Sequence, residues 1–447
     1  MEWNKLISAK RFGLEDKVNP NDEHIRSQFQ RDYDRLIFSS PFRRLQNKTQ
    51  VFPLPGRIFV HNRLTHSLEV ASVGRSLGNI ASTYIKNDMG ASNPKFIDEI
   101  GTIVATACLA HDLGNPPFGH SGEEAISSFF RDGKGQHLKQ YVNKEQWIDL
   151  TNFEGNANAL RVLTHTFKGR RQGGFGISYS TLASVVKYPF NSMNSPKGKK
   201  YGFFQSERDT YIKIAQELGI NALDIEKDIY ARHPLVYLVE AADDICYQIM
   251  DIEDAHKLSI LSTDLTKDLL FSYFDEITDK ERLKTIDNTF KIVTDRNEQI
   301  AFLRASIIGK LTDECSEAFW KNSESILKGE YKNTLIKDIS KKSVNAYQEC
   351  TKLATTEIYH TKTVVEIQIA GFKILGTLLD EFTQAILSPN RFYSKHILSL
   401  IPEQFDINKD DIYSQIQSIV DHVAGMTDPY ALDLYRTIKG IHLPDMN

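Results

Sequence analysis

The sequence predicts an all-α fold. Apolar side chains recur at helical spacing through five long stretches, which are residues 68–85, 97–109, 235–252, 364–386 and 412–423. Helix-breaking residues interrupt this pattern where helices are expected to end. After Asp112, for example, Gly114 precedes Pro116 and Pro117, and no helix continues through two consecutive prolines. His111 and Asp112 are therefore expected at the C-terminal end of a helix.

Two stretches do not fit a helix. Residues 50–60 place Pro53, Pro55 and Gly56 between apolar pairs, which predicts a short β ribbon or an extended loop. Residues 188–204 are rich in Asn, Ser, Pro, Gly and Lys, and this loop is too long for a plain connector. We expect a mobile flap or a partner surface there.

The chain has no internal repeat, low-complexity tract or Gly/Ser linker that would separate domains. We divide it, for convenience, into three parts. Residues 1–60 form an N-terminal helical arm with the ribbon, residues 61–260 form the core that carries the chemistry, and residues 261–447 form a C-terminal helical region packed on that core.

Composition is that of an ordinary globular protein. The 447 residues are 41% hydrophobic and 25% charged, and the net charge of −4 gives no global electrostatic case for nucleic-acid binding. No signal peptide and no membrane-length apolar run is present, so neither export nor membrane insertion is indicated. We expect a reducing cytoplasm, because the cysteines form no close pair; they are Cys108, Cys246, Cys315 and Cys350.

Two histidines and two aspartates form a candidate metal-binding set. His66 lies in NRLTHSLEVA, His111 and Asp112 in ACLAHDLGN, and Asp243 in VEAADDICY. This mixture of nitrogen and oxygen donors suits a divalent first-row metal or Mg²⁺ with open positions for water and phosphate oxygens. It lacks the thiolates of a structural zinc site, so a catalytic metal is the better interpretation.

Each of these residues also has an ordinary structural interpretation. A lone histidine is usually a core or surface group, and the acidic pair Asp243 and Asp244 would usually be a solvated face. However, the His-Asp pair closes the apolar run 103–110, and Asp243 follows the apolar run 235–242. Burying these charges would be unfavourable without a partner, and a metal would compensate for it.

Positions four apart share one face of a helix, so Asp243, Tyr247 and Asp251 form a single polar row. Tyr247 could contact a sugar hydroxyl or a phosphate, and Asp251 could accept a hydrogen bond from the sugar. A core tyrosine and a surface aspartate are equally compatible with the pattern. Asp244 falls off that face and is the less suitable ligand.

His120 and Glu123 are three residues apart at the start of a helix, where the carboxylate can orient the imidazole as an acid-base pair. Acidic residues also simply favour a helix start, which is the interpretation we prefer for Glu124. Phosphate binding requires cations, for which Arg63 is the first candidate and Lys187 the second. The basic clusters 168–171 and 197–200 are interpreted first as solvated loops.

Six segments spread through most of the chain resemble those of the deoxyguanosine triphosphate triphosphohydrolases, whose HD-type metal site has the order His, His-Asp, Asp. They are SPFRRLQNKTQVF, HNRLTHSLEVA, HDLGNPPFGHSGEEA, FEGNANALR, HPLVYLVEAADDICY and DHVAGMTDPYAL. The resemblance implies an HD-domain helical core with additional C-terminal helices. It also implies one divalent metal ion per subunit, with Mg²⁺ or Mn²⁺ expected and Zn, Fe or Ni as alternatives.

The resemblance assigns roles by position. It implies that the metal is held by His66, His111, Asp112 and Asp243, and that His120 and Glu123 serve in catalysis. The positions that match nucleotide contacts are Gln50, Arg63, Lys187, Tyr188, Tyr247 and Asp251. Gln50 would lie near the deoxyribose, and Tyr247 under the sugar would disfavour a 2′-hydroxyl.

The activity that the resemblance implies is hydrolysis of dGTP or other deoxynucleoside triphosphates by metal-activated water, which attacks the α-phosphorus and gives deoxynucleoside and tripolyphosphate. Such enzymes are usually homo-oligomers, often hexamers or tetramers. Some respond to single-stranded DNA or to a deoxynucleotide at a second site, and the sequence decides neither point. The alternatives are an HD phosphohydrolase acting on another nucleotide phosphoester, or a non-catalytic nucleic-acid-binding regulator.

Overall fold

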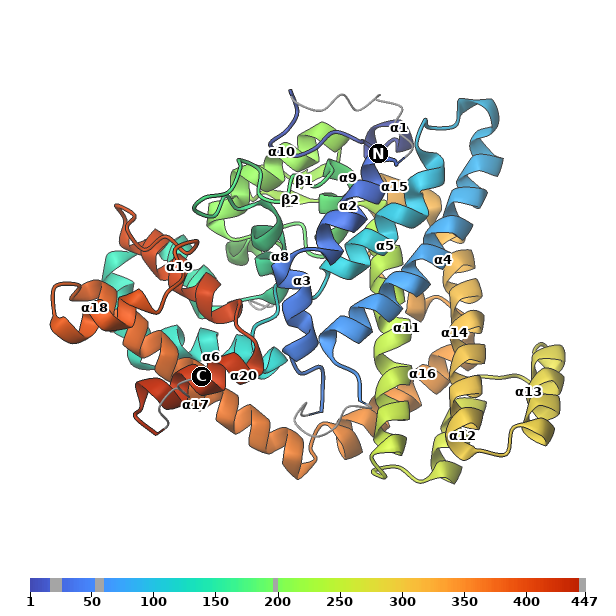
Figure 1. Cartoon of the computed structure of the whole chain (residues 1–447). Coiled ribbons are helices and arrows are strands. Elements are labelled where there is room, and N and C mark those ends of the chain that lie inside the picture. Colours follow the sequence, from blue (N-terminus) through green and yellow to red (C-terminus); the bar gives the residue numbers. More distant parts are fainter. Residues whose placement is uncertain (17–25, 53–59, 196–199, 442–447) are drawn as a thin grey trace.

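The computed structural model describes residues 1–16, 26–52, 60–195 and 200–441 and is built almost entirely from helices (Figure 1). Its centre is a group of long helices that pack against one another. They are α4 (Arg63–Met89), α5 (Ile100–Ala110), α11 (Pro234–Lys257) and α14 (Arg296–Lys321). The all-α prediction is confirmed.

The other helices surround this centre. The N-terminal part contributes α1 (Trp3–Leu6), α2 (Gln28–Ile37) and α3 (Ser40–Arg44). The middle of the chain contributes α6 (Gly119–Arg131), α7 (Lys144–Thr151), α8 (Gly155–Thr164), α9 (Tyr179–Val185) and α10 (Arg208–Leu218). The C-terminal part contributes α12 (Thr263–Phe271), α13 (Lys280–Ile292), α15 (Ser323–Lys328), α16 (Lys341–Leu353), α17 (Lys362–Leu387), α18 (Phe392–Ser399), α19 (Ile412–Ala424) and α20 (Asp428–Ile438).

The five periodic stretches of the sequence correspond to α4, α5, α11, α17 and α19. Local signals fix where two of the central helices, α4 and α11, begin. At the start of α4, Asn62 and Thr65 form a reciprocal capping box, in which each side chain accepts the other residue's backbone N–H. At the start of α11, Pro234 occupies the first position, where a missing N–H removes no helical hydrogen bond.

A two-stranded antiparallel hairpin was not predicted. It consists of β1 (Ala222–Asp224) and β2 (Ile229–Tyr230). Its strands are two and three residues long and none of their residues is buried, so they leave no alternation of apolar and polar side chains to detect.

The ribbon predicted at residues 50–60 falls mostly on 53–59, which lie outside the described residues. On either side of that segment, Thr49 and Asn62 form an isolated antiparallel bridge. The predicted loop at 188–204 has three aromatic residues at its C-terminal end, Tyr201, Phe203 and Phe204, and all three are buried. That end of the loop is therefore part of the core.

The buried apolar side chains form two clusters. The first surrounds α4, α5, α11 and α14 and includes Leu77, Ile103 and Leu238. The second joins α6 to the C-terminal helices and includes Phe130, Leu379 and Ile419. The C-terminal helices, orange and red in Figure 1, thus pack on the segment that follows the His-Asp pair. The division at residues 60 and 260 remains a proposal.

A buried ion-pair triad ties the middle of the chain to its C-terminal part. The Arg161 guanidinium on α8 donates two hydrogen bonds of 2.7 Å to Asp421 on α19 and one of 2.6 Å to Glu207. All three side chains are almost completely buried. Removing one member would leave a buried charge without its partner, which is strongly destabilising.

None of the described helices has the length and apolar character needed to cross a membrane.

A second ion-pair group connects the beginning of α4 to the end of α11. His61 Nδ1 lies 2.8 Å from Asp254 Oδ2, and His61 Nε2 lies 3.2 Å from Glu69 Oε1. Burial alone would lower the pKa of His61, but the hydrogen bonds to these two carboxylates outweigh it and raise the pKa to about 10.

Folding raises the pKa of His61 from 6.5 to about 10. The protonated ring therefore stabilises the folded protein fully below pH 6.5, and this contribution is lost as the pH rises through 10. We expect His61→Ala to lower the free energy of unfolding by about 2 to 3 kcal/mol below pH 6.5 and by much less above pH 10. Urea unfolding of wild type and variant at both pH values measures the difference. His137→Ala removes an exposed histidine and is the control; an equal loss at both pH values would contradict the assignment.

Candidate metal centre and active-site pocket

One pocket of about 330 Å³ contains nearly all the candidate site residues. Its walls come from α4, the end of α5, the start of α6 and α11, which are far apart in the sequence. Among the predicted residues, those that line it are Gln50, Arg63, His66, His111, Asp112, His120, Glu123, Lys187, Tyr188, Asp243 and Tyr247. Asp251 is the one predicted residue that does not line it.

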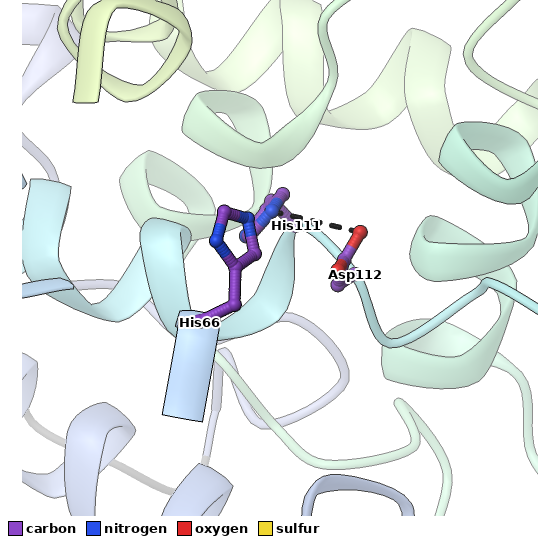
Figure 2. A group of neighbouring side chains, drawn as sticks. All are labelled: His66, His111 and Asp112. Carbon is purple, nitrogen blue, oxygen red and sulfur yellow. Dashed lines mark ion pairs between the residues drawn. The ribbon is translucent and has the colours of Figure 1, made fainter. Parts of the chain in front are cut away.

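The four candidate metal ligands converge in this pocket. Ligand atoms of His66, His111 and Asp112 all lie within 4.8 Å of one another (Figure 2). Asp243 joins them from α11, with its Oδ1 at 3.1 Å from His66 Nε2 and 3.6 Å from His111 Nε2. His111 Nε2 is also 3.5 Å from Asp112 Oδ1.

Hydrogen bonds around the cluster orient its donor atoms. His111 is the C-terminal cap of α5, and its Nδ1 donates to the Cys108 carbonyl at 2.6 Å. This leaves the lone pair of His111 on Nε2, which faces the carboxylates. Asp112 accepts hydrogen bonds from Arg63 Nη1 at 2.8 Å and from the Asn115 side chain.

Both carboxylates of the cluster are ionised. Burial opposes ionisation of Asp243, but His111 and His66 outweigh it and hold the pKa of Asp243 below its usual value. Burial likewise opposes ionisation of Asp112, yet the Arg63 guanidinium and His111 lower its pKa. Two imidazole nitrogens and two ionised carboxylates, without a thiolate, match the donors of a catalytic divalent metal site. The residues therefore fit such an ion.

His120 and Glu123 form a hydrogen-bonded pair at the pocket edge. His120 Nδ1 lies 3.0 Å from Glu123 Oε2, and the backbone N–H of Gly155 donates to Glu123 Oε1 at 2.8 Å. The His120 side chain is 78% exposed, whereas Glu123 is nearly buried. Burial opposes ionisation of Glu123, but the His120 hydrogen bond outweighs it and lowers the Glu123 pKa. An ionised, fixed Glu123 therefore orients a solvent-accessible imidazole.

Gly155 explains why two distant motifs meet here. A Cβ atom at this position would lie 2.2 Å from Asn115 Oδ1 and 2.7 Å from Glu123 Oε1. Only glycine therefore lets the segment FEGNANALR approach the loop after the His-Asp pair closely enough to bond Glu123.

Cationic side chains surround the pocket. Lys187 Nζ lies 3.1 Å from Glu240 Oε1. Burial alone would lower the pKa of Lys187, but the attraction of the Glu240 carboxylate outweighs it and raises this pKa. Lys200, which the sequence interpretation assigned to a solvated loop, also lines the pocket and pairs with Glu154 at 3.0 Å. Its position was not predicted because a run of lysines in a loop carries no signal that one of them turns inward.

The polar row on α11 divides between the pocket and the interior. Tyr247 lines the pocket, with its ring centroid 6.4 Å from that of His66. Asp251 is buried one turn further on, where it accepts a 2.6 Å hydrogen bond from the Tyr359 hydroxyl. Burial raises the pKa of Asp251 to about 7. Tyr359 follows a π-helical turn, and no sequence pattern singled it out.

Two polar atoms of the pocket wall are buried without a hydrogen-bond partner among the described residues. They are Gln50 Oε1 and Arg63 Nε. Buried polar atoms are rarely left unpaired, so such atoms beside a pocket indicate a polar ligand. Asn115 and Asn156, which also line the pocket, were not predicted either.

Two protein-family models match the chain. Residues 63–155 match the HD domain, and residues 338–437 match the phosphohydrolase-associated domain. The first range contains three of the four clustered ligand candidates together with His120 and Glu123. Together with the geometry above, this defines an HD-domain protein of the metal-dependent phosphohydrolase class.

Curated relatives specify the family. The chain is 37% identical to a deoxyguanosinetriphosphate triphosphohydrolase-like protein of Synechocystis sp., over 99% of this chain and 100% of the relative. It is 36% identical to a protein of the same description from Pseudomonas aeruginosa, with the same coverage. It is also 28% identical to the deoxyguanosinetriphosphate triphosphohydrolase of Yersinia enterocolitica, over 98% and 99%. The chain belongs to the deoxyguanosinetriphosphate triphosphohydrolase family and is an enzyme of that metal-dependent class, which confirms the resemblance in its sequence.

Proposed function

We propose that this enzyme hydrolyses deoxynucleoside triphosphates, dGTP among them, to deoxynucleoside and tripolyphosphate. The observation that carries the proposal is a single pocket that unites a metal-type cluster, an acid-base pair and several cations. These are the parts that phosphate-ester hydrolysis requires, namely an activated water, a proton carrier and neutralisation of negative charge. The names of the relatives supply the substrate class.

His66, His111, Asp112 and Asp243 would hold one divalent cation, with Mg²⁺ or Mn²⁺ expected and Zn, Fe or Ni as alternatives. Such an ion supplies Lewis-acid activation of the α-phosphate and a water of lowered pKa. Arg63 keeps Asp112 in place and adds positive charge beside it.

His120 is the proton carrier in this proposal. Its Nδ1 is engaged by Glu123, which leaves Nε2 free to exchange a proton at the scissile phosphoester oxygen. Its exposure makes it accessible to substrate, and the buried carboxylate of Glu123 fixes the ring orientation. A positioned acid or base of this type contributes about 10² to 10⁴-fold to a rate.

The phosphate chain would lie between Lys187 and Lys200, with Tyr188 and Asn156 as neutral contacts. Both lysines are held by carboxylates of the protein, Glu240 and Glu154 respectively, so their ammonium groups are ordered before substrate binds. Such preorganised charges stabilise a developing phosphate charge with little reorganisation.

The deoxyribose would lie against Tyr247 and near Gln50, whose buried Oε1 lacks a partner among the described residues. A tyrosine ring packed under the sugar leaves no room for a 2′-hydroxyl, which favours deoxynucleotides. Asp251, which does not line the pocket, would contribute through its hydrogen bond with Tyr359.

We further propose that the enzyme is a cytoplasmic homo-oligomer, a hexamer or a tetramer. This proposal rests on the family resemblance in the sequence. A regulatory deoxynucleotide or single-stranded DNA stays a prediction from the family resemblance.

The substrate class is tested by incubating the purified enzyme with Mg²⁺ or Mn²⁺ and a panel of deoxy- and ribonucleoside triphosphates. We expect tripolyphosphate as the phosphate product, from deoxynucleotides only, as measured by ion chromatography. Orthophosphate or pyrophosphate would instead support an HD phosphohydrolase of another phosphoester. Absence of turnover together with tight single-strand binding would support a non-catalytic regulator.

The assigned roles are tested by separating metal binding from turnover. We expect His111→Ala to abolish both, because it removes a ligand. We expect His120→Ala to lower kcat by about 10² to 10⁴-fold while metal affinity persists. His396→Ala, at an exposed position of α18, is the control. Equal loss of metal affinity in the His111 and His120 variants, measured by calorimetric titration, would contradict these roles.

A further inference from the structure

Residues 112–119 form an irregular loop that connects the two halves of the site, and we call it the site loop. It begins at Asp112 in the metal-type cluster and ends at Gly119, where α6 starts and presents His120 and Glu123. Between Asp112 and Phe118 the loop contains no helix or strand of its own, so the separation between the cluster and the His120–Glu123 pair depends on the neighbouring groups that hold its backbone.

Lys48 holds the first half of the site loop. Its side chain is buried, and its Nζ donates to the Asn115 carbonyl at 2.5 Å and to the Ala424 carbonyl at 2.8 Å. The Asn115 side chain in turn donates to Asp112 Oδ1. A buried side chain from the N-terminal part of the chain thus connects the end of a C-terminal helix, through Asn115, to the carboxylate of the cluster.

Asp428 holds the second half. It opens α20 and is buried, and its Oδ1 accepts the Phe118 backbone N–H at 3.0 Å while its Oδ2 accepts that of Thr49 at 2.9 Å. Phe118 has the left-handed conformation, with φ of 63°, which a bulky residue rarely adopts without support. It is also the N-terminal cap of α6, so its position determines where His120 lies.

Helix α17 supports the same residue from the other side. A Cβ atom at Gly371 would lie 2.9 Å from both Cβ and Cγ of Phe118, so the Phe118 side chain is seated directly against the helix backbone. Phe118 is therefore held by α20 through its N–H and by α17 through its ring.

We propose that Lys48 and Asp428 are positioning residues that set the geometry between the metal site and the His120–Glu123 pair. Lys48 acts through Asn115 on Asp112, and Asp428 acts through Phe118 on His120. This inference rests on the proposed function, since it assumes that the two halves of the site act on one substrate. It gives the phosphohydrolase-associated region, matched at 338–437, a specific part in catalysis.

The two residues are expected to have different effects, because they act on opposite ends of the loop. Asp428→Ala is expected to lower kcat by about 10 to 100-fold, since a displacement of His120 by about 1 Å has an effect of that size. KM and metal affinity are expected to stay within about twofold of wild type. Asp428→Asn keeps one acceptor oxygen and is expected to give an intermediate kcat. The pH dependence of kcat should also change. One side of that profile reports the ionisation of the His120–Glu123 pair, which depends on where the pair lies.

Lys48→Met is expected to weaken the binding of Mn²⁺ alone by about 10-fold, because it frees Asn115 and removes a fixed donor to Asp112. Mn²⁺ binding is measured by titration without nucleotide. Asp433→Asn on α20 and Lys321→Met on α14 make the same kinds of substitution at exposed residues away from the site loop and are the matched controls. Circular dichroism and thermal unfolding report whether each variant is folded.

The proposal is overturned if Asp428→Asn has wild-type kcat and pH profile, or if Lys48→Met binds Mn²⁺ as wild type does. It is also overturned if both variants lose Mn²⁺ affinity and kcat in parallel with Tm, which is what a purely structural role would give. Failure of the proposed function is distinguishable, because wild type would then release no tripolyphosphate from any deoxynucleotide. The Mn²⁺ titration of Lys48→Met is independent of that result.

Discussion

The rest of the site depends on the convergence of two carboxylates and two imidazoles in one pocket. Asp243 Oδ1 is within 3.6 Å of both imidazole Nε2 atoms, and Asp112 is buried beside them. Ionised carboxylates in such a place are unfavourable unless positive charge compensates for their lost hydration. Arg63 supplies part of that charge, and a divalent cation would supply the remainder.

Buried contacts between segments that are distant in the chain hold the parts of the fold around this cluster. Arg161 pairs with Asp421, Lys48 bonds the Ala424 carbonyl, and Asp428 accepts the N–H of Thr49, 379 residues away. These bonds are buried, so each is harder to replace by water than a surface contact. The C-terminal helices therefore do more than cover the HD domain, since they hold the loop that joins the candidate ligand Asp112 to the His120–Glu123 pair.

Sequence periodicity was sufficient for the all-α class and for the helices that became α4, α5, α11, α17 and α19. The motifs also singled out the candidate ligands and the pair His120 and Glu123, and the structure places all of these residues around one pocket. What it could not reveal depends on tertiary contacts. Lys200 is one of several lysines in a loop, and Asp251 shares a helix face with Tyr247 yet lies outside the pocket and bonds Tyr359. Lys48 and Asp428 are single residues whose partners are backbone atoms, which leave no trace in the pattern of side chains.

The most direct test of the central claim is the anomalous scattering of crystals grown with Mn²⁺. We expect one peak per subunit, with His66 Nε2, His111 Nε2 and oxygens of Asp112 and Asp243 within about 2.0 to 2.3 Å of it. A peak elsewhere, or none among these four side chains at saturating Mn²⁺, would contradict the account.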